Sequence, residues 1–453
     1  TSERSGWKHL YHYDKTGTLL TQVTDGPWEF RNLVRLGIVS PAGGEPAFVD
    51  LADYTRGDFL ISSTGWWPDA SRLSFTIQNR TQTWLDLCTV SPRGGTPTRL
   101  LRDATEAWIE APSLFRVLRD GSFLLTSERS GWKHLYHYDK TGTLLTQVTD
   151  GPWEFRSLVR LDEDRSEIFF TCTADSPLAT TLYAVNLDGS DLRQLTPNRG
   201  THRTTISPGG AYIVDSWSTA HTPDRTLLRD RNGKILRTLD TNPVFDLDTW
   251  ERGTLELLRI PASRTTDDDP IMLEAMFIYP PDFDPDRRYP VWFSTYAGPH
   301  APTVRDSWAG GRAHDHMLTT SGFLVFRADP YSASGKGARS AWTAYKRLGV
   351  PEMEDINDLM EWLKAQPFVD PDRIGMSGFS YGGFITAYAM THSTHFARGI
   401  AGGSVTDWRD YDTIYTERYM QTPQDNPEGY AATSVVAAAK NLHGTLLLTH
   451  GWM

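Results

Sequence analysis

The chain has 453 residues, of which 39% are hydrophobic and 22% charged, and its formal net charge is -11. This length predicts two domains, and the negative charge argues against a nucleic-acid partner. No apolar run reaches the length of a membrane span. The two cysteines, Cys88 and Cys172, form no disulfide framework and lack the spacing of a metal site.

Residues 1–36 and 126–161 are nearly the same sequence, with Asn32 in the first copy where Ser157 stands in the second. Structural repeats drift apart, so near-identity over this length is not typical of a blade repeat. We interpret the first copy as a recent duplication, a cloning scar or a misjoined sequence read, rather than an old functional repeat. Whatever naturally precedes Gly37 is therefore expected to be missing.

From residue 37 to about 250, short apolar runs alternate with glycine-containing turns. The turns lie at Gly43, Gly94, Gly142, Gly189 and Gly233. They recur about every 45 to 50 residues, which is typical of β-propeller blades with four strands each. A β-sandwich gives similar alternation without so steady a period. We therefore predict a partial, all-β propeller over 37–250, with roughly five blades' worth of sequence.

Several polar features of this half have ordinary structural interpretations. His134 and His137 would point to opposite faces of one strand, as would His9 and His12, so no shared metal site is predicted. Asn79 begins a glycosylation sequon that has little weight without evidence for the compartment. No metal and no other cofactor is predicted for the chain.

After residue 250 the sequence changes to strands that alternate with helical patterns. The predicted strands lie at 255–260, 271–279, 290–296, 322–329, 372–377 and 446–451, and an acidic hairpin turn lies at 267–269. Residues 352–366 carry apolar side chains at helical spacing. This alternation predicts a mostly parallel α/β sheet.

Residues 378–383 read Gly-Phe-Ser-Tyr-Gly-Gly, the nucleophile-elbow pattern, in which a serine sits on a strained turn from strand to helix. A side chain at Gly378 or Gly382 would collide where the chain reverses. The strand predicted before this turn and the helix predicted after it, over 384–390, supply the context that the elbow requires. Ser380 is therefore the candidate nucleophile.

Residues 37–453 resemble the dipeptidyl peptidase IV branch of the prolyl oligopeptidase family. The motifs that carry the resemblance are the elbow, Tyr-Ala-Gly-Pro at 296–299 and Asp-Trp-Arg-Asp-Tyr-Asp-Thr-Ile-Tyr-Thr-Glu-Arg-Tyr-Met at 407–420. The family joins a β-propeller to an α/β-hydrolase domain, which implies a hydrolase domain at 251–453, truncated at its C-terminus. Phe379 stands where relatives often have Trp. Residues 329–332 depart from the family's Asp-x-Arg-Gly/Ser pattern.

The resemblance implies roles for seven residues. Ser380 would be the acylating nucleophile, with its oxyanion held by the Tyr381 backbone N–H and the Tyr296 hydroxyl. Donors fixed at the start of a helix do stabilise developing negative charge. The pocket for the proline ring of the substrate's second residue would consist of Val405, Trp408, Tyr411 and Tyr415. Tyr411 and Tyr415 are expected on one face of a helix, and the alternative for these aromatic residues is ordinary core packing.

Two parts of the family's machinery are not found. A serine hydroxyl needs a general base, and the hydrolase order is serine, acid, histidine. In the family the acid follows the His-Gly strand, here at 450–451, by a few residues, so the acid and the histidine are expected beyond Met453. No internal acid or histidine is assigned to the triad. The glutamate pair that holds the substrate's amino terminus is expected upstream of Gly37.

The sequence therefore predicts that the parent protein is a serine peptidase that releases X-Pro or X-Ala dipeptides from peptide amino termini through an acyl-enzyme. The chain itself, as a fragment, is expected to lack efficient turnover. The alternatives are an acylaminoacyl peptidase or oligopeptidase of the same family, and a non-catalytic relative that binds peptides or proteins. Peptides are the expected partners, and a homodimer is expected of the full-length protein. The resemblance slightly favours a periplasmic or secreted location.

Overall fold

The structure is a computed structural model that describes residues 11–13, 19–22, 36–54, 58–245, 249–266 and 269–451, without the side chains of 11–13, 19–22, 310 and 311. The described residues form two compact units. The first takes its residues from 11–111, 117–123 and 138–143, and the second takes the remainder. None of the described helices combines the length and apolarity that crossing a bilayer requires.

The first unit contains one complete antiparallel sheet and two short hairpins. The sheet consists of β5 (Phe59–Trp66), β6 (Leu73–Asn79), β7 (Trp84–Val90) and β8 (Thr98–Ala104). The hairpins are β1 (Tyr11–Tyr13) with β2 (Leu19–Gln22) and β3 (Gly37–Ile38) with β4 (Ala47–Phe48), and η1 (Ala52–Tyr54) follows β4. Most of the duplicated stretch 1–36 lies outside the described residues.

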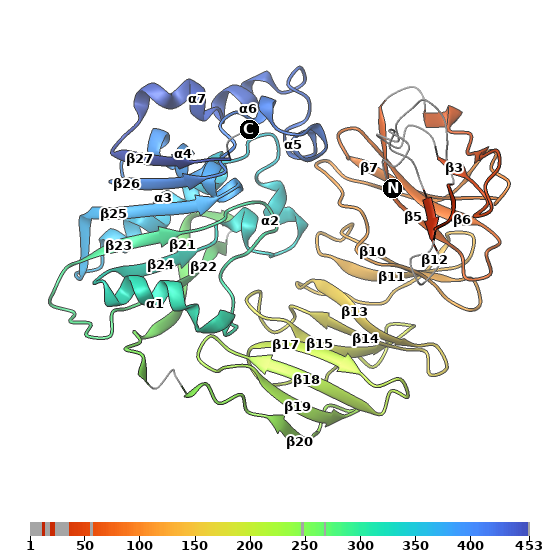
Figure 1. Cartoon of the computed structure of the whole chain (residues 1–453), viewed down its shortest axis with the longest axis horizontal. Helices are drawn as coiled ribbons and strands as arrows, with labels where there is room; N and C mark the ends of the chain where they lie inside the picture. The colour runs from red at the N-terminus through yellow and green to blue at the C-terminus, as the bar shows by residue number, and fades with distance from the viewer. Residues whose placement is uncertain are drawn as a thin grey trace. The chain divides into compact units, whose positions relative to one another are not determined.

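Three further four-stranded sheets follow in chain order (Figure 1). The first has the strands β9 (Phe115–Val117), β10 (Phe123–Ser127), β11 (His134–Tyr138) and β12 (Leu144–Gln147). The second has β13 (Phe155–Asp162), β14 (Glu167–Cys172), β15 (Thr181–Asn186) and β16 (Arg193–Gln194). The third has β17 (Thr201–Ile206), β18 (Tyr212–Ser218), β19 (Arg225–Asp230) and β20 (Ile235–Asp240).

Four of the predicted glycine turns, at Gly94, Gly142, Gly189 and Gly233, join the third and fourth strands of the four-stranded sheets, and Gly43 lies in the β3–β4 hairpin. Gly142 and Gly233 have φ of 90° and 87°, a region that only glycine enters freely. A Cβ atom on Gly142 would lie 2.2 Å from the Leu100 carbonyl oxygen, and one on Gly233 would lie 2.2 Å from that of Leu195. Both carbonyls belong to the previous repeat, so each glycine lets a turn pack on the preceding sheet. Four complete propeller-like blades and the β3–β4 hairpin account for the five predicted repeats.

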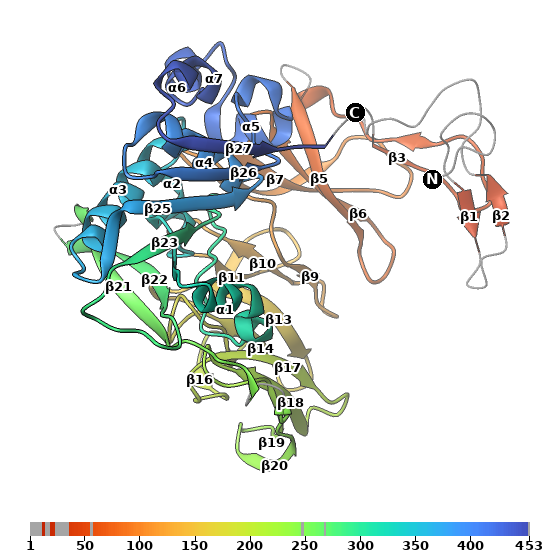
Figure 2. The ribbon, with the colours of Figure 1, turned by 60° about the vertical axis from the view of Figure 1, so that its left-hand side comes forward.

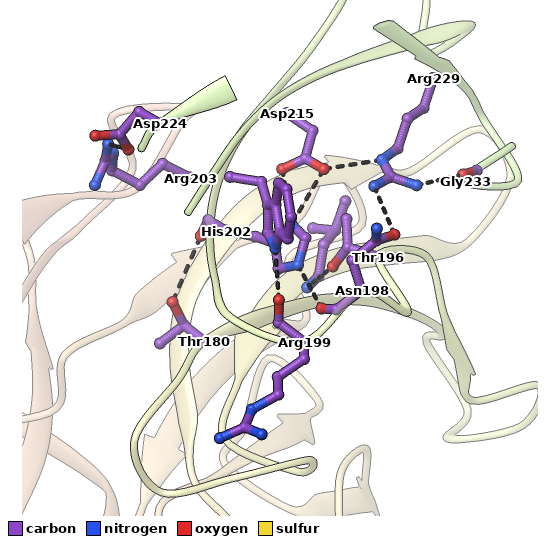
Figure 3. A network of polar contacts seen from close by, with 12 residues as sticks. Thr180, Thr196, Asn198, Arg199, His202, Arg203, Asp215, Asp224, Arg229 and Gly233 are labelled. Atoms are coloured by element: carbon purple, nitrogen blue, oxygen red, sulfur yellow. Dashed lines mark hydrogen bonds and ion pairs between the residues drawn. The ribbon is translucent and has the colours of Figure 1, made fainter. Parts of the chain in front are cut away.

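A buried network of charges crosses three strands of the last blade (Figure 3). Asp215 on β18 contacts His202 Nδ1 on β17 and Arg229 Nε on β19, each at 2.9 Å. His202 Nε2 and Arg229 Nη1 donate to the carbonyl oxygens of Asn198 and Gly233, both at 2.9 Å. The three side chains are at most 1% exposed. Since a buried charge is costly unless it is paired, this network holds the three strands in one register.

The second unit also contains a seven-stranded sheet, with the order β21-β22-β24-β23-β25-β26-β27. Its strands are β21 (Leu255–Thr266), β22 (Asp269–Ile278), β23 (Tyr289–Ser294), β24 (Leu324–Ala328), β25 (Val369–Phe379), β26 (Arg398–Gly402) and β27 (Thr445–Thr449). Five neighbouring strands of this order are parallel, namely β24, β23, β25, β26 and β27. The remaining two, β21 and β22, add an antiparallel hairpin at one edge. Figure 2 shows β27, β26, β25 and β23 in succession. The prediction of a mostly parallel sheet is confirmed, and the predicted domain boundary at 250/251 falls between β20 and β21.

Helices connect these parallel strands. They are η3 (Ala309–Arg312), α1 (Ala313–Thr320), η4 (Tyr331–Ala333), α2 (Ala338–Trp342), α3 (Val350–Lys364), α4 (Tyr381–His392), η5 (Trp408–Asp410), α5 (Thr413–Met420), α6 (Pro427–Ala432), α7 (Val435–Ala438) and η6 (Ala439–Asn441). The connection from β23 to β24 leads toward the β21 edge of the sheet. The connections from β24 to β25 and from β25 to β26 lead toward the β27 edge. Right-handed crossovers therefore place α1 on one face and α3 and α4 on the opposite face. The reversal makes the carboxyl ends of β23 and β25 the topological switch point, where ligands bind in open α/β sheets.

Candidate active site

Ser380 lies at this switch point, between the end of β25 and the start of α4. Its φ and ψ are 59° and -117°, a conformation that is strained for a residue with a side chain. Its backbone N–H donates to the Gly402 carbonyl oxygen at 2.9 Å. A Cβ atom on Gly378 would lie 2.3 Å from the Gly382 carbonyl oxygen, so the turn cannot close around a larger residue. The predicted arrangement of strand, turn and helix is confirmed.

Two tyrosines flank this turn. Tyr381 is the first residue of α4, where the backbone N–H has no acceptor within the helix. Tyr296 follows the end of β23 by two residues and is half-buried. The two ring centroids are 6.0 Å apart. The structure thus brings together the three residues for which the sequence predicted roles in acylation, and their roles stay predictions.

An aromatic cluster extends from Tyr381 toward solvent. The indole of Trp408, which is 2% exposed, has its ring centroid 5.6 Å from that of Tyr381. It stacks on Tyr415 at 5.9 Å and meets Tyr411 edge-on at 5.9 Å. Tyr411 is 43% exposed, and Val405 is half-buried in the loop between β26 and η5. The three aromatic residues predicted to line the proline pocket are therefore in mutual contact, and Tyr411 is the most exposed of them, whereas Val405 lies in the loop before them.

One detail of this prediction is wrong. Tyr411 does not share a helix with Tyr415, because α5 begins only at Thr413. The Asp412 carboxylate accepts the backbone N–H of Tyr415 at 2.9 Å and so caps the helix, which leaves Tyr411 in extended conformation before it. The two rings still meet, with centroids 5.5 Å apart. Asp is a preferred cap residue, so the sequence contained a signal for this helix start.

Glu352 is a buried acid beneath the elbow that the sequence analysis did not single out. Its side chain is fully buried and accepts hydrogen bonds from the Ser332 hydroxyl at 2.9 Å and the Gly349 backbone N–H at 2.8 Å. The Tyr381 hydroxyl donates to it at 3.4 Å. Burial raises the pKa of Glu352 to about 7, with a contribution from the nearby Asp355. No pattern in the sequence joins these distant positions.

Two of the tyrosine hydroxyls at the site, those of Tyr381 and Tyr415, stay neutral because their pKa values are raised. Burial raises the pKa of Tyr381 well above its ordinary value, and the proximity of Glu352 adds to this. Burial likewise raises the pKa of Tyr415 well above its ordinary value, and nearby tyrosines add a smaller contribution in the same direction. Neutral phenols keep their protons and can donate hydrogen bonds, and their rings supply apolar surface.

Asp407 and His392, which were not assigned to a triad, have other partners. Asp407 accepts the Ser434 hydroxyl at 2.7 Å, and His392 stacks on Tyr388 with ring centroids 3.8 Å apart. His450 is exposed. Among the described residues, no histidine or carboxylate forms a hydrogen bond with the Ser380 hydroxyl.

Comparison with protein families gives two matches. Residues 1–36 and 31–224 match the profile described as "Dipeptidyl peptidase IV (DPP IV) N-terminal region". Residues 312–453 match the profile described as "Prolyl oligopeptidase family". The same propeller profile therefore matches both the first copy of the duplicated stretch and the region that contains the second.

Curated proteins and solved structures with the same names are similar over most of the chain. A probable dipeptidyl peptidase 4 of Aspergillus clavatus is 28% identical over 438 residues, which cover 92% of this chain and 56% of that protein. The crystal structure of Porphyromonas gingivalis dipeptidyl peptidase 4 superposes with a TM-score of 0.82 at 30% identity and covers 90% of this chain and 57% of that one. The crystal structure of a putative dipeptidyl aminopeptidase IV from Bacteroides ovatus superposes with a TM-score of 0.83 at 29% identity. The match covers 92% of this chain and 61% of that one.

The chain spans little more than half the length of these relatives. The matched regions nevertheless include both the blade-like sheets and the elbow with its aromatic cluster. The arrangement of blades followed by an α/β sheet is the one on which the relatives' structures superpose. The chain therefore belongs to the dipeptidyl peptidase IV-like branch of the prolyl oligopeptidase family.

Proposed function

We propose that the protein carrying this chain is a serine peptidase that releases dipeptides from the amino termini of peptides, with a preference for proline or alanine as the second residue. The observation that carries the proposal is the strained Ser380 at the switch point, next to Tyr296 and the aromatic cluster. A serine in this conformation presents its hydroxyl at the top of the sheet, where a substrate carbonyl can approach.

In the proposed reaction, Ser380 Oγ attacks the carbonyl carbon of the substrate's second residue and loses its proton to a general base, which we do not assign to any described residue. The carbonyl oxygen becomes negatively charged as the C–O bond to serine forms. The Tyr381 N–H and the Tyr296 hydroxyl would donate hydrogen bonds to it, and such donors typically contribute a hundredfold or more to turnover. Collapse of the intermediate expels the remaining peptide as an amine, and water then hydrolyses the ester.

Specificity would come from the aromatic cluster. Trp408, Tyr411 and Tyr415 present ring faces and edges that suit a compact apolar ring. Because only Tyr411 of these rings is widely exposed, the apolar surface that the cluster offers to a substrate is small and would suit a small side chain. This favours proline or alanine at the second position of the substrate.

The test compares the protein that carries this chain with its Ser380→Ala variant. Hydrolysis of Gly-Pro-p-nitroanilide and covalent labelling by a fluorophosphonate are both expected to disappear in the variant. Ser393→Ala, at the other end of α4, is the matched control and should change neither. Hydrolysis of amino-terminally blocked Gly-Pro-p-nitroanilide at an equal rate would favour an oligopeptidase or acylaminoacyl peptidase. Absence of labelling in the unaltered protein would refute the proposal in favour of a non-catalytic binding protein.

A further inference from the structure

The loop that carries Tyr296 has a demanding backbone conformation. Ala297 and His300 have φ of 62° and 58°, in the left-handed region that residues with side chains seldom occupy. Such conformations persist only where the surroundings impose them, and they gather at functional sites. The loop after β23 therefore depends on contacts that hold it in place.

The far end of this loop is held by one buried acid. The Asp329 carboxylate, which is 1% exposed, accepts the backbone N–H groups of Thr303 and Val304 at 2.8 to 2.9 Å and the Thr303 hydroxyl at 2.6 Å. Asp329 belongs to the segment that departs from the family's pattern. Its contacts hold Thr303 and Val304 at the end of the loop. The middle of the loop, around His300, needs a different contact.

The His300 residue supplies that contact. The His300 backbone N–H donates to the Ser332 carbonyl oxygen at 3.0 Å. Its Nε2 lies 3.1 Å from the Gly337 carbonyl oxygen and 3.3 Å from Glu154 Oε1. Both neighbours of Nε2 are acceptors, so this nitrogen carries a proton and donates it. His300 thus ties the loop to residues 332–337 and to the start of β13.

Glu154 provides a fixed anion for this contact. Its side chain is 1% exposed, and its Oε2 lies 3.1 Å from Arg156 Nη1. Burial alone would raise its pKa, but the nearby His300, Arg156 and Lys133 side chains hold the pKa below the ordinary value. The Glu154 backbone N–H donates to the Thr173 hydroxyl at 3.0 Å, which anchors the residue to the blade sheet. A second acid, Glu128, lies 4.0 Å from His300 Nδ1.

We propose that the Glu154–His300 pair positions the loop that carries Tyr296, and so sets the place of the Tyr296 hydroxyl in the oxyanion site. The inference rests on the proposed function, because it gives a role to the same tyrosine. Glu154 and His300 are positioning residues in this account, since they act through Tyr296 and do not touch the reacting atoms. The blade that contains β13 thereby contributes to the chemistry of the hydrolase sheet through the contact between Glu154 and His300.

The first variant is Glu154→Gln, which keeps the size of the side chain and removes its charge. In the protein that carries this chain, kcat for Gly-Pro-p-nitroanilide is expected to fall about tenfold or more while KM stays within about twofold, because the lost interaction serves the transition state. The matched control is Glu361→Gln, which changes an exposed glutamate whose Oε1 lies 3.4 Å from His395 Nε2. It should leave both constants unchanged.

The second variant, His300→Asn, covers the case in which Glu154→Gln does not fold. Asparagine tolerates a positive φ, so the backbone can keep its conformation while the imidazole is lost. The same fall in kcat is expected. An unchanged kcat in this folded variant would overturn the proposal.

The decisive measurement combines either variant with Tyr296→Phe. If the Glu154–His300 pair acts through the Tyr296 hydroxyl, removing the pair should hardly lower kcat further in a protein that already lacks that hydroxyl. Losses that multiply independently would show a general structural role and overturn the inference, while leaving the proposed function intact. Hydrolysis that survives Ser380→Ala would instead refute the proposed function, and this inference with it.

Discussion

The buried acid beneath the elbow leads to a prediction of pH-dependent stability. Glu352 accepts hydrogen bonds from Ser332, Gly349 and Tyr381, yet its complete burial raises its pKa to about 7. Glutamate in an unfolded chain has its ordinary pKa near 4.5. The folded protein therefore holds the proton of Glu352 more tightly than the unfolded protein does.

The sign and size of the effect follow from this difference. Because the folded pKa is raised, the stabilisation is fully present below the unfolded pKa and is lost as the pH rises through about 7. A difference of about 2.5 units corresponds to roughly 3 kcal/mol at 1.36 kcal/mol for each unit. The free energy of unfolding should therefore fall by about 3 kcal/mol between pH 4.5 and pH 8 from Glu352 alone, mostly between pH 5 and 7.

The assay compares the unaltered protein with Glu352→Gln in urea-induced unfolding from pH 4.5 to pH 8. The difference between their free energies of unfolding isolates the contribution of the acid, because all other titrating groups are shared. The control is Glu354→Gln, which removes an exposed carboxylate from the same helix and should give a curve parallel to that of the unaltered protein. In addition, infrared spectra should show a protonated carboxyl band that disappears near pH 7 and is absent from Glu352→Gln. Parallel stability curves for Glu352→Gln and the unaltered protein would refute the reasoning.

Three further predictions concern the elbow, the last blade and the pocket. Gly378→Ala should abolish fluorophosphonate labelling, because its Cβ would lie 2.3 Å from a carbonyl oxygen; labelling at the ordinary rate would contradict this. Asp215→Asn should destabilise the protein in urea by about 3 to 5 kcal/mol, because it leaves the buried Arg229 guanidinium without its anion, whereas Asp224→Asn at the more exposed pair in Figure 3 should cost at most about 1 kcal/mol. Equal losses would contradict this. Tyr411→Ala should raise KM for Gly-Pro-p-nitroanilide about tenfold, and Tyr411→Phe should leave it nearly unchanged; an unchanged KM in the alanine variant would place the proline ring elsewhere.

Local sequence was sufficient wherever the physical requirement is itself local. Gly142 and Gly233 had to be glycine because their backbones turn at positive φ beside another strand. The regular spacing of such glycines is what allowed the blade repeat to be predicted. The apolar runs around 290–296 and 322–329 became β23 and β24 because parallel strands are covered on both faces. The start of α5 was misplaced because the helical spacing of the tyrosines was given more weight than the capping carboxylate of Asp412.

By itself, the sequence determined the order of elements, the glycine turns and the elbow around Ser380, because steric rules and short-range periodicity act between neighbouring residues. Which polar side chains meet depends on the tertiary structure. Glu154 and His300 are far apart in the chain, as are Glu352 and Tyr381, and each pair is brought together by packing of separate elements. A buried charge depends for its partner on the three-dimensional surroundings that exclude water, and the spacing of residues along the chain carries no record of those surroundings.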